Sequence, residues 1–202
     1  MLKREVKAIL FDMDGTLANS LMAWYFTYND SLKEFGFKKI SNGEFVKRFG
    51  NPIEKDIKDK FIGKTVIEVK SAFNRNFSKR LKLVKLMPGA ELTLKELRKR
   101  NIKLALITGS TRKITSGILK KFNLKKYFGC ILGMEDVKRR KPAPDMVLKA
   151  CRLLKVKPQN AIIVGDTMND ITAGKRAKCV TVGYKIKGDY IIEKLKDILR
   201  IN

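Results

Sequence analysis

The sequence predicts an α/β fold, a doubly wound (Rossmann-like) parallel sheet that carries an inserted α-helical domain. Two observations indicate this fold. Short apolar runs alternate with helical patterns over most of the chain, whereas residues 17–85 show helical patterns only. The apolar runs are continuous, which is typical of strands buried on both faces of a parallel sheet. The length of 202 residues allows one compact domain with a smaller insertion.

The expected strands are short runs rich in leucine and β-branched residues. They are Val6–Phe11, Ile102–Ile107, Gly129–Leu132, Ala161–Val164 and Cys179–Val182. Between them, apolar residues recur every three or four positions, as they do along one face of a helix. The expected helices of this part are Ala90–Arg100, Thr111–Asn123, Pro144–Leu154, Asn169–Ala177 and Asp189–Leu199. Strands that alternate with helices in this way predict βαβ units.

The expected α-helical insertion is residues 17–85, and residues 1–16 and 86–202 form the expected α/β core. Helices are expected at about 20–35, 43–49, 52–61 and 65–85, with no buried strand among them. This segment holds most of the aromatic residues of the chain. Their concentration favours a helical bundle with an aromatic core. A substrate pocket that borrows one or two of these side chains is the alternative.

The composition excludes several kinds of chemistry. The chain has no histidine, which excludes a Ser-His-Asp triad and histidine-ligated metals. Its three cysteines, Cys130, Cys151 and Cys179, are widely spaced and odd in number, which argues against a disulfide framework and a zinc site. No apolar stretch approaches the roughly 18 residues that span a bilayer. The start of the chain shows no signal-peptide pattern, so we expect a cytoplasmic protein.

The chain is strongly basic, with 45 Lys and Arg against 20 Asp and Glu and a net charge of +25. Such a charge attracts polyanions, so nucleic acid is a candidate partner. The excess is spread along the chain, and the longest basic run, residues 138–141, lacks interleaved aromatic residues for base stacking. A solvated basic surface is therefore the favoured interpretation, and a nucleic-acid partner is the alternative.

Four polar clusters follow an expected strand or precede an expected helix. The first two are Asp12-Met-Asp14-Gly-Thr16 and Thr108-Gly-Ser110. The other two are Lys141-Pro-Ala-Pro144 and Gly165-Asp166-Thr-Met-Asn-Asp170. Because ligands bind outside the carboxyl ends of the strands in an open α/β sheet, we expect these clusters to converge there.

Four acidic residues of these clusters would meet in one crevice. They are Asp12, Asp14, Asp166 and Asp170. Such a concentration of negative charge needs a cation, and oxygen ligands without histidine or cysteine select Mg²⁺. The remaining clusters add a hydroxyl group at Thr108, an unobstructed backbone N–H at Gly109 and a positive charge at Lys141. These three groups predict a cradle for a phosphoryl group.

The four clusters, in this order and over nearly the whole length, closely resemble those of the haloacid dehalogenase-like phosphohydrolase superfamily. The inserted segment 17–85 matches the α-helical cap of its phosphoglycolate phosphatase-like branch. The resemblance implies a phosphatase that hydrolyses a phosphomonoester of a small metabolite, of the 2-phosphoglycolate or sugar phosphate class. Residues 17–85 would then be the cap that closes over the site and excludes water.

The resemblance also implies a role for each acidic residue. Asp12 would be the nucleophile that accepts the phosphoryl group as an aspartyl-phosphate. Asp14 would be the general acid for the leaving oxygen and then the general base for water. Mg²⁺ would be bound by Asp12, the backbone carbonyl of Asp14 and Asp166. Asp170 would support the metal through a bound water or would orient Lys141.

Other residues that match the motifs of this superfamily indicate the type of reaction. Thr108, Gly109 and Lys141 would stabilise the charged phosphoryl oxygens. Dehalogenases of the superfamily lack the second acidic residue of the first cluster, so Asp14 favours phosphoryl transfer. Phosphomutases of the superfamily use a histidine in the cap linker, and its absence here favours hydrolysis.

Residues 46–52 look like the specificity loop of the family's cap. Within this segment, Lys47 or Arg48 could meet a remote anionic group of the substrate, and ordinary exposed basic residues are the alternative. Three other functions stay open beside the metabolite phosphatase: a nucleic-acid end phosphatase, a phosphomutase and a non-catalytic binding protein. The sequence does not indicate the oligomeric state.

Overall fold

The computed structural model describes residues 5–51 and 53–201, and within these residues one parallel sheet has the strand order β5-β4-β1-β6-β7-β8. Its strands are β1 (Ala8–Phe11), β4 (Lys103–Ile107), β5 (Cys130–Leu132), β6 (Ala161–Gly165), β7 (Val180–Tyr184) and β8 (Tyr190–Ile192). Strand β1 lies in the middle, between β4 and β6. Strands extend from β1 in both directions, so the prediction of a doubly wound α/β fold is confirmed.

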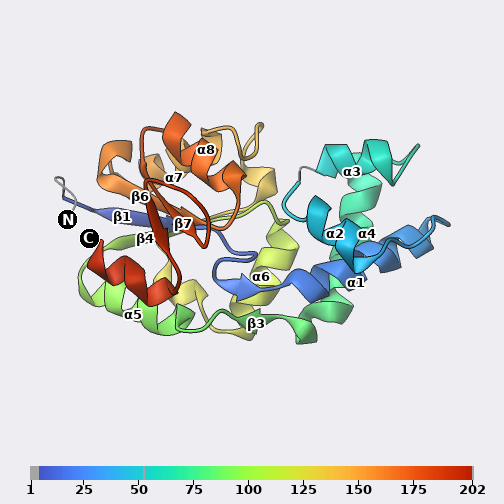
Figure 1. Cartoon of the computed structure of the whole chain (residues 1–202), viewed down its shortest axis with the longest axis horizontal. Coiled ribbons are helices and arrows are strands. Elements are labelled where there is room, and N and C mark those ends of the chain that lie inside the picture. The colour runs from blue at the N-terminus through green and yellow to red at the C-terminus, as the bar shows by residue number, and fades with distance from the viewer. Residues whose placement is uncertain (1–4, 52, 202) are drawn as a thin grey trace.

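Helices cover both faces of this sheet (Figure 1). They are α5 (Ala90–Lys99), α6 (Arg112–Lys121), α7 (Asp145–Leu154) and α8 (Met168–Arg176). In β1, Ile9 and Phe11 pack into the apolar cluster that includes side chains of α5 and α6. Ala8 and Leu10 pack into the opposite cluster, with side chains of α7 and α8. Both faces of β1 are therefore buried, which explains its continuous apolar sequence.

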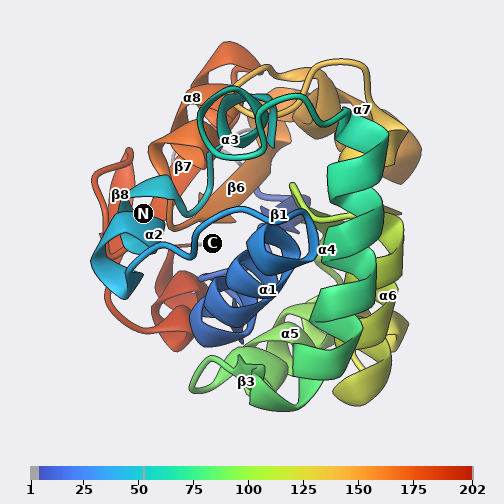
Figure 2. The ribbon, with the colours of Figure 1, turned by 90° about the vertical axis from the view of Figure 1, so that its right-hand side faces the viewer.

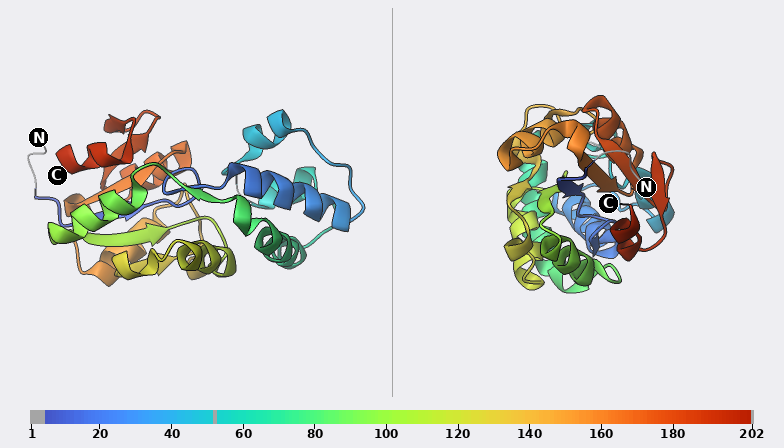
Figure 3. Two further views of the ribbon diagram at one scale, coloured as in Figure 1. Left: turned by 90° about the horizontal axis from the view of Figure 1, so that it is seen from below. Right: turned by 90° about the vertical axis from the view of Figure 1, so that its left-hand side faces the viewer.

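A separate group of helices lies beyond one end of the sheet, so that the two parts lie end to end (Figure 3). These helices are α1 (Leu21–Glu34), α2 (Asn42–Arg48), α3 (Ile53–Asp59) and α4 (Val66–Arg80). They share an apolar cluster in which the ring of Tyr28 lies 5.2–5.9 Å from the rings of Phe45, Phe61 and Phe73. The aromatic residues that the sequence concentrates here thus form the core of this helical bundle.

The bundle joins the sheet through a short antiparallel ribbon, which the sequence did not indicate. Strands β2 (Ala18–Asn19) and β3 (Lys85–Leu86) pair with each other. The helix expected over 65–85 begins after a capping box at Thr65 and Glu68 and ends at Arg80. The 3₁₀ turn η1 (Leu81–Leu83) then leads into β3. The two segments that connect the bundle to the rest of the chain, β2 and β3, therefore lie side by side.

The prediction of a helix over Asp189–Leu199 is wrong. This segment forms the edge strand β8 and the 3₁₀ helix η5 (Leu195–Arg200). The backbone N–H and the hydroxyl group of Thr181 each donate to the carboxylate of Asp189 at 2.9 Å, which ties the start of the segment to β7. Tyr190 and the two isoleucines after it then pair with β7, as aromatic and β-branched residues favour.

Three further short 3₁₀ helices connect the main elements. They are η2 (Lys125–Tyr127), η3 (Met134–Asp136) and η4 (Pro158–Asn160). Among the residues that the structure describes, no helix combines the length and the apolar sequence that crossing a membrane requires.

Candidate active site

The polar clusters follow the carboxyl ends of adjacent strands. Asp12 comes directly after β1, Thr108 after β4 and Asp166 after β6. The register aligns the ends of these three strands, because the last residue of β1 lies opposite residues near the ends of β4 and β6. These ends point towards the helical bundle (Figure 1). The first, second and fourth clusters therefore meet between the sheet and the bundle, as expected for an open α/β sheet.

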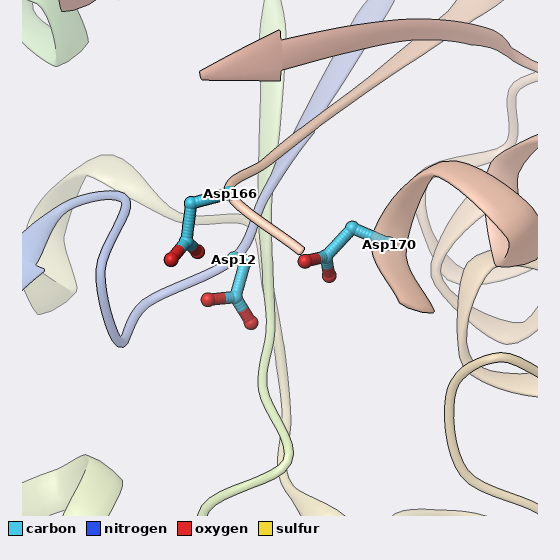
Figure 4. A group of neighbouring side chains, drawn as sticks. All are labelled: Asp12, Asp166 and Asp170. Carbon is cyan, nitrogen blue, oxygen red and sulfur yellow. The ribbon is translucent and has the colours of Figure 1, made fainter. Parts of the chain in front are cut away.

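Three carboxylates converge at this point. One oxygen atom from each of Asp12, Asp166 and Asp170 lies within 4.8 Å of the others (Figure 4). Asp170 stands in the first turn of α8, where its carboxylate accepts hydrogen bonds from the N–H of Thr167 at 3.2 Å and from its hydroxyl group at 2.6 Å. Asp166 accepts a hydrogen bond from Thr16 at 2.9 Å. Three hard oxygen donors at this spacing suit a divalent cation such as Mg²⁺.

Lys141 reaches into the same group of carboxylates. Its Nζ donates to Asp12 and to Asp170, at 2.5 Å each, and to the backbone carbonyl of Ile107 at 3.2 Å. The side chain is buried, and burial alone would lower its pKa. The carboxylates of Asp12 and Asp170 outweigh this effect and raise the pKa of Lys141 above its ordinary value. The lysine therefore carries a fixed positive charge beside Asp12.

Burial also sets the protonation of the carboxyl groups. It raises the pKa of Asp12 well above its ordinary value; Lys141 opposes this rise, and Asp170 and Asp166 add to it. Burial, with a contribution from Asp170, raises the pKa of Asp166 to about 6. A divalent cation would favour the ionised form of these groups, because it would offset the crowding of negative charge.

Asp14 lies apart from this acidic group. One of its carboxylate oxygens accepts hydrogen bonds from Ser20 Oγ at 2.6 Å and from Trp24 Nε1 at 3.0 Å. The other accepts from Ser110 Oγ at 2.6 Å and, more weakly, from Thr108 Oγ1 at 3.4 Å. The two aspartates of the first cluster therefore have different surroundings, with a lysine beside Asp12 and neutral donors around Asp14.

Two glycines are required for this geometry. Gly15 has a φ of +89°, and a Cβ atom there would overlap the carboxylate of Asp166. A Cβ atom at Gly165 would lie 2.3 Å from the Cβ atom of Asp170 and would therefore overlap that side chain. The glycines of the first and fourth clusters thus let the acidic side chains approach one another.

A cavity of about 170 Å³ lies over these residues, between the sheet and the helical bundle. Asp12, Asp14, Lys141 and Asp170 belong to its lining on the sheet side, together with Thr108 and Gly109. The bundle contributes aromatic walls. They are Trp24, Tyr28, Phe45, Phe49 and Phe73. Three of these side chains, Tyr28, Phe45 and Phe73, belong to the bundle core and also line the cavity.

Contacts between the bundle and the sheet side surround the cavity. Asn169 Nδ2 donates to the backbone carbonyl of Gly50 at 3.0 Å. Glu54 on α3 forms an ion pair with Arg140. On the other side, α4 and α6 run next to each other (Figure 2). These contacts hold the bundle over the acidic residues.

The two basic residues expected near the substrate have different positions. Lys47 is exposed and lies outside the lining of the cavity, whereas Arg48 belongs to the lining. Arg48 lies between three carboxylates, at 3.6 Å from Glu44, 3.4 Å from Asp56 and 3.2 Å from Asp59. Its charge is thus already compensated within the bundle.

Several polar residues of the site were not singled out from the sequence. Their side chains donate hydrogen bonds to Asp14, Asp166 or Asp170, and they are Thr16, Ser20, Trp24, Ser110 and Thr167. Ser110 could have been found, because it follows Thr108 by two positions in the same cluster. Ser20 and Trp24 are one helical turn apart at the start of α1, which is a weaker signal.

The parallel sheet carries convergent carboxylates and a buried lysine beneath a covering helical bundle, an arrangement of the class of α/β enzymes with an acidic centre. The family model described as haloacid dehalogenase-like hydrolase matches residues 9–184, which include all four clusters. The chain belongs to this family. It is a phosphoric monoester hydrolase.

Known relatives align over almost the whole chain. A phosphoglycolate phosphatase of Aquifex aeolicus is 32% identical, with 97% of this chain and 96% of the relative covered. A pyrophosphatase PpaX of Halalkalibacterium halodurans is 30% identical, with 98% and 97% covered. Among solved structures, a predicted phosphoglycolate phosphatase from Haemophilus somnus is similar at a TM-score of 0.82, with 28% identity and 99% of each chain covered. CbbY from Rhodobacter sphaeroides, solved with phosphate, has the same fold at a TM-score of 0.85, with 20% identity and 96% of each chain covered.

Proposed function

We propose that this chain is a Mg²⁺-dependent phosphatase that hydrolyses a phosphomonoester of a small metabolite through an aspartyl-phosphate at Asp12. The observation that carries the proposal is the convergence of Asp12 with Asp166 and Asp170 while Asp14 is held apart by neutral donors. The relatives named for phosphoglycolate and pyrophosphate support a small substrate. The first candidate substrates are 2-phosphoglycolate and sugar phosphates, and pyrophosphate is a further candidate.

The donor set fits the proposed metal. Asp12, Asp166, Asp170 and the backbone carbonyl of Asp14 would hold Mg²⁺, which prefers hard oxygen ligands. The bound ion would supply positive charge to the phosphoryl oxygens and to the crowded carboxylates. Lys141 compensates two of these carboxylates from the other side, since it donates to Asp12 and Asp170.

The chemistry then runs through the two aspartates of the first cluster. A carboxylate oxygen of Asp12 forms a bond to phosphorus as the bond to the leaving oxygen breaks, and Asp14 gives that oxygen its proton. In the second step, Asp14 takes a proton from water, and the water oxygen forms a bond to phosphorus. The bond between phosphorus and Asp12 breaks, which releases phosphate and restores both carboxyl groups.

Three further groups would bind the phosphoryl oxygens. Thr108 and Gly109 line the cavity at the end of β4, and Lys141 lines it beside Asp12. A hydroxyl group, a backbone N–H and an ammonium group at this place would stabilise the negative charge of the transferring group. Ser110 would keep Asp14 oriented, because its hydroxyl group donates to that carboxylate at 2.6 Å.

The domain organisation forms part of the proposal. Residues 1–16 and 86–202 would be the phosphatase core, and residues 17–85 would be the cap. The cavity between the sheet and the bundle supports this division, since its lining comes from both. A closed cap would exclude water from the first step and keep the cavity apolar around the substrate.

A phosphatase screen tests the proposal. Phosphate release is measured for 2-phosphoglycolate, sugar phosphates, pyrophosphate and an aryl phosphate, with Mg²⁺ and with a chelator. We expect release from at least one small ester with Mg²⁺, loss of release with the chelator, and loss in the Asp12→Asn variant. The proposal is contradicted if Mg²⁺ stimulates phosphate release from none of these compounds. Full activity of the Asp12→Asn variant would also contradict it.

The charge of +25 favours one second candidate, a nucleic-acid end phosphatase with the same chemistry. An oligonucleotide with a terminal phosphate in the same screen distinguishes the two. The second candidate predicts a preference for the oligonucleotide over small esters and an affinity that falls steeply with salt. Preference for a small ester excludes it.

A further inference from the structure

Among the described residues, four cationic side chains line the cavity. They are Arg48, Lys70, Arg140 and Lys141. Lys141 belongs to the group of residues around Asp12, so three cations are left to face the remainder of a bound substrate. In a cavity with aromatic walls, an uncompensated positive charge attracts an anion more strongly than it would on the surface.

Each of these three cations has a carboxylate within 4 Å, and two of them are held at hydrogen-bond distance. Arg48 lies within 4 Å of three carboxylates of the bundle. Arg140 forms an ion pair with Glu54, which links the sheet side to α3. Neither guanidinium group therefore offers its full charge to a ligand.

Lys70 differs from both. It forms an ion pair with Glu135, but the Nζ–Oε1 distance of 3.7 Å is too long for a hydrogen bond. The other carboxylate oxygen of Glu135 accepts a hydrogen bond from the backbone N–H of Arg112 at 2.9 Å. The side chain of Lys70 is only 24% exposed. Lys70 is thus a partly buried cation with a weak partner in the wall of the cavity.

Lys70 stands on the helix of the bundle that contacts the region of the second cluster. It stands on α4, one helical turn of about 5.4 Å before Asn74. Asn74 contacts Thr111 by a hydrogen bond, and Thr111 directly follows the second cluster, which holds Thr108 and Gly109. Helix α4 lies next to α6 on this side of the cavity (Figure 2). Lys70 and the proposed phosphoryl cradle therefore line the same cavity, Lys70 from the bundle and the cradle from the sheet side.

We propose that Lys70 binds a second anionic group of the substrate, a carboxylate or a phosphate, on the leaving-group side of the scissile bond. The inference rests on the proposed phosphatase function and adds the class of substrate to it: a phosphomonoester or phosphoanhydride that carries a further negative charge near the phosphoryl group. In this proposal Lys70, and not Lys47 or Arg48, binds the remote anionic group of the substrate.

The test compares substrates that differ in the second group. We use 2-phosphoglycolate, whose second group is a carboxylate, pyrophosphate, whose second group is a phosphate, and 2-hydroxyethyl phosphate, in which a neutral hydroxymethyl group replaces the carboxylate. The variants are Lys70→Met, which removes the charge at similar length, and Lys70→Arg, which keeps it. Lys47→Met is the matched control, because Lys47 is an exposed cap lysine outside the cavity. Circular dichroism and thermal unfolding show whether each variant folds.

The readout is the ratio of kcat/KM for each anionic substrate to kcat/KM for 2-hydroxyethyl phosphate. We expect the wild type to prefer 2-phosphoglycolate or pyrophosphate, which identifies the second group. Lys70→Met should lower this ratio by about tenfold or more, as loss of a charged hydrogen bond does. Lys70→Arg should keep most of the ratio, and Lys47→Met should leave it unchanged.

Failure of the inference is distinct from failure of the proposed function. A wild-type protein that releases phosphate from none of the esters contradicts the phosphatase itself. An active wild type without preference for an anionic substrate overturns the inference about Lys70. So does a folded Lys70→Met variant whose ratio equals that of the wild type, whatever its absolute rate.

Discussion

The ammonium group of Lys141 lies 2.5 Å from a carboxylate oxygen of Asp12, and each side chain is only 8% exposed. The same ammonium group donates to Asp170 at 2.5 Å. One buried positive charge thus compensates two buried carboxylates, one directly after strand β1 and the other in the first turn of helix α8. This relationship ties the third cluster to the first and the fourth, and it makes the charge of Lys141 important for folding as well as for chemistry.

Replacement of Lys141 by methionine should destabilise the protein when Mg²⁺ is absent. The variant leaves Asp12 and Asp170 without their buried counter-charge, so the free energy of unfolding should fall by about 3–5 kcal/mol. Urea unfolding in the presence of a chelator measures the change. Lys120→Met is the control, since Lys120 is exposed on α6 and its loss should change stability by less than about 0.5 kcal/mol. Equal stability of the two variants would contradict this account of Lys141.

Replacement of Gly15 by alanine should abolish most of the activity. The new Cβ atom would overlap the carboxylate of Asp166 and displace it, and a displacement of about 1 Å can lower a rate by roughly 100-fold. Gly36→Ala is the matched control: Gly36 also has a positive φ, +78°, but a Cβ atom there meets open space. This control should lose about 1 kcal/mol of stability and keep its phosphatase rate. Similar rates in both variants would show that the contact with Asp166 is unimportant.

The stability of the metal-free protein should depend on pH through Asp166. Burial raises the pKa of this group from 3.8 to about 6 in the folded state, so the folded state binds its proton more tightly than the unfolded chain does. The contribution of Asp166 to stability is therefore present below pH 3.8 and is lost as the pH rises through about 6.

The matching variant is Asp166→Asn, which does not titrate. The free energy of unfolding of the wild type, relative to that of Asp166→Asn, should fall as the pH rises from about 4 to 6. Stabilisation by added Mg²⁺ should grow over the same range, because the ion competes with the proton for this carboxylate. Chemical unfolding at a series of pH values measures both effects, and a difference that stays constant with pH refutes the prediction.

Removal of the hydroxyl group of Ser110 should slow the reaction without unfolding the protein. Asp14 would lose one of its two shortest hydrogen bonds, so its carboxyl group would be less well oriented for proton transfer. We expect kcat of Ser110→Ala to fall by about tenfold, as loss of one partner of a buried hydrogen bond implies. Ser116→Ala, at an exposed position of α6, should keep the wild-type kcat. Equal kcat values for the two variants would remove Ser110 from the site.

The sequence was sufficient for the α/β fold because its strands are continuously apolar and its helices periodic. It was also sufficient to predict that Asp12 and Asp166 lie close together. Both residues directly follow strands, and these strands are neighbours in the sheet. Local patterns could not determine the edge strand β8, where pairing with β7 and the link between Thr181 and Asp189 override a helical pattern. Tertiary contacts decide such segments.

The sequence also could not predict which side chains pair with each other when they are far apart in the chain. Arg48 looked available for a substrate, but its compensation depends on Asp56 and Asp59, which belong to another helix of the bundle. Lys70 attracted no attention, because only the folded structure places it in the wall of the cavity. A basic chain offers many candidate lysines, and burial and pairing are needed to distinguish them.

The most direct test of the central claim is chemical trapping of Asp12. The protein is mixed with a substrate from the screen and Mg²⁺, quenched in acid during turnover and treated with borohydride, which reduces an acyl phosphate to an alcohol. The account predicts homoserine at position 12 in the peptide mass spectrum, dependent on substrate and absent from Asp12→Asn. Turnover that leaves Asp12 unmodified while another residue is reduced would contradict it.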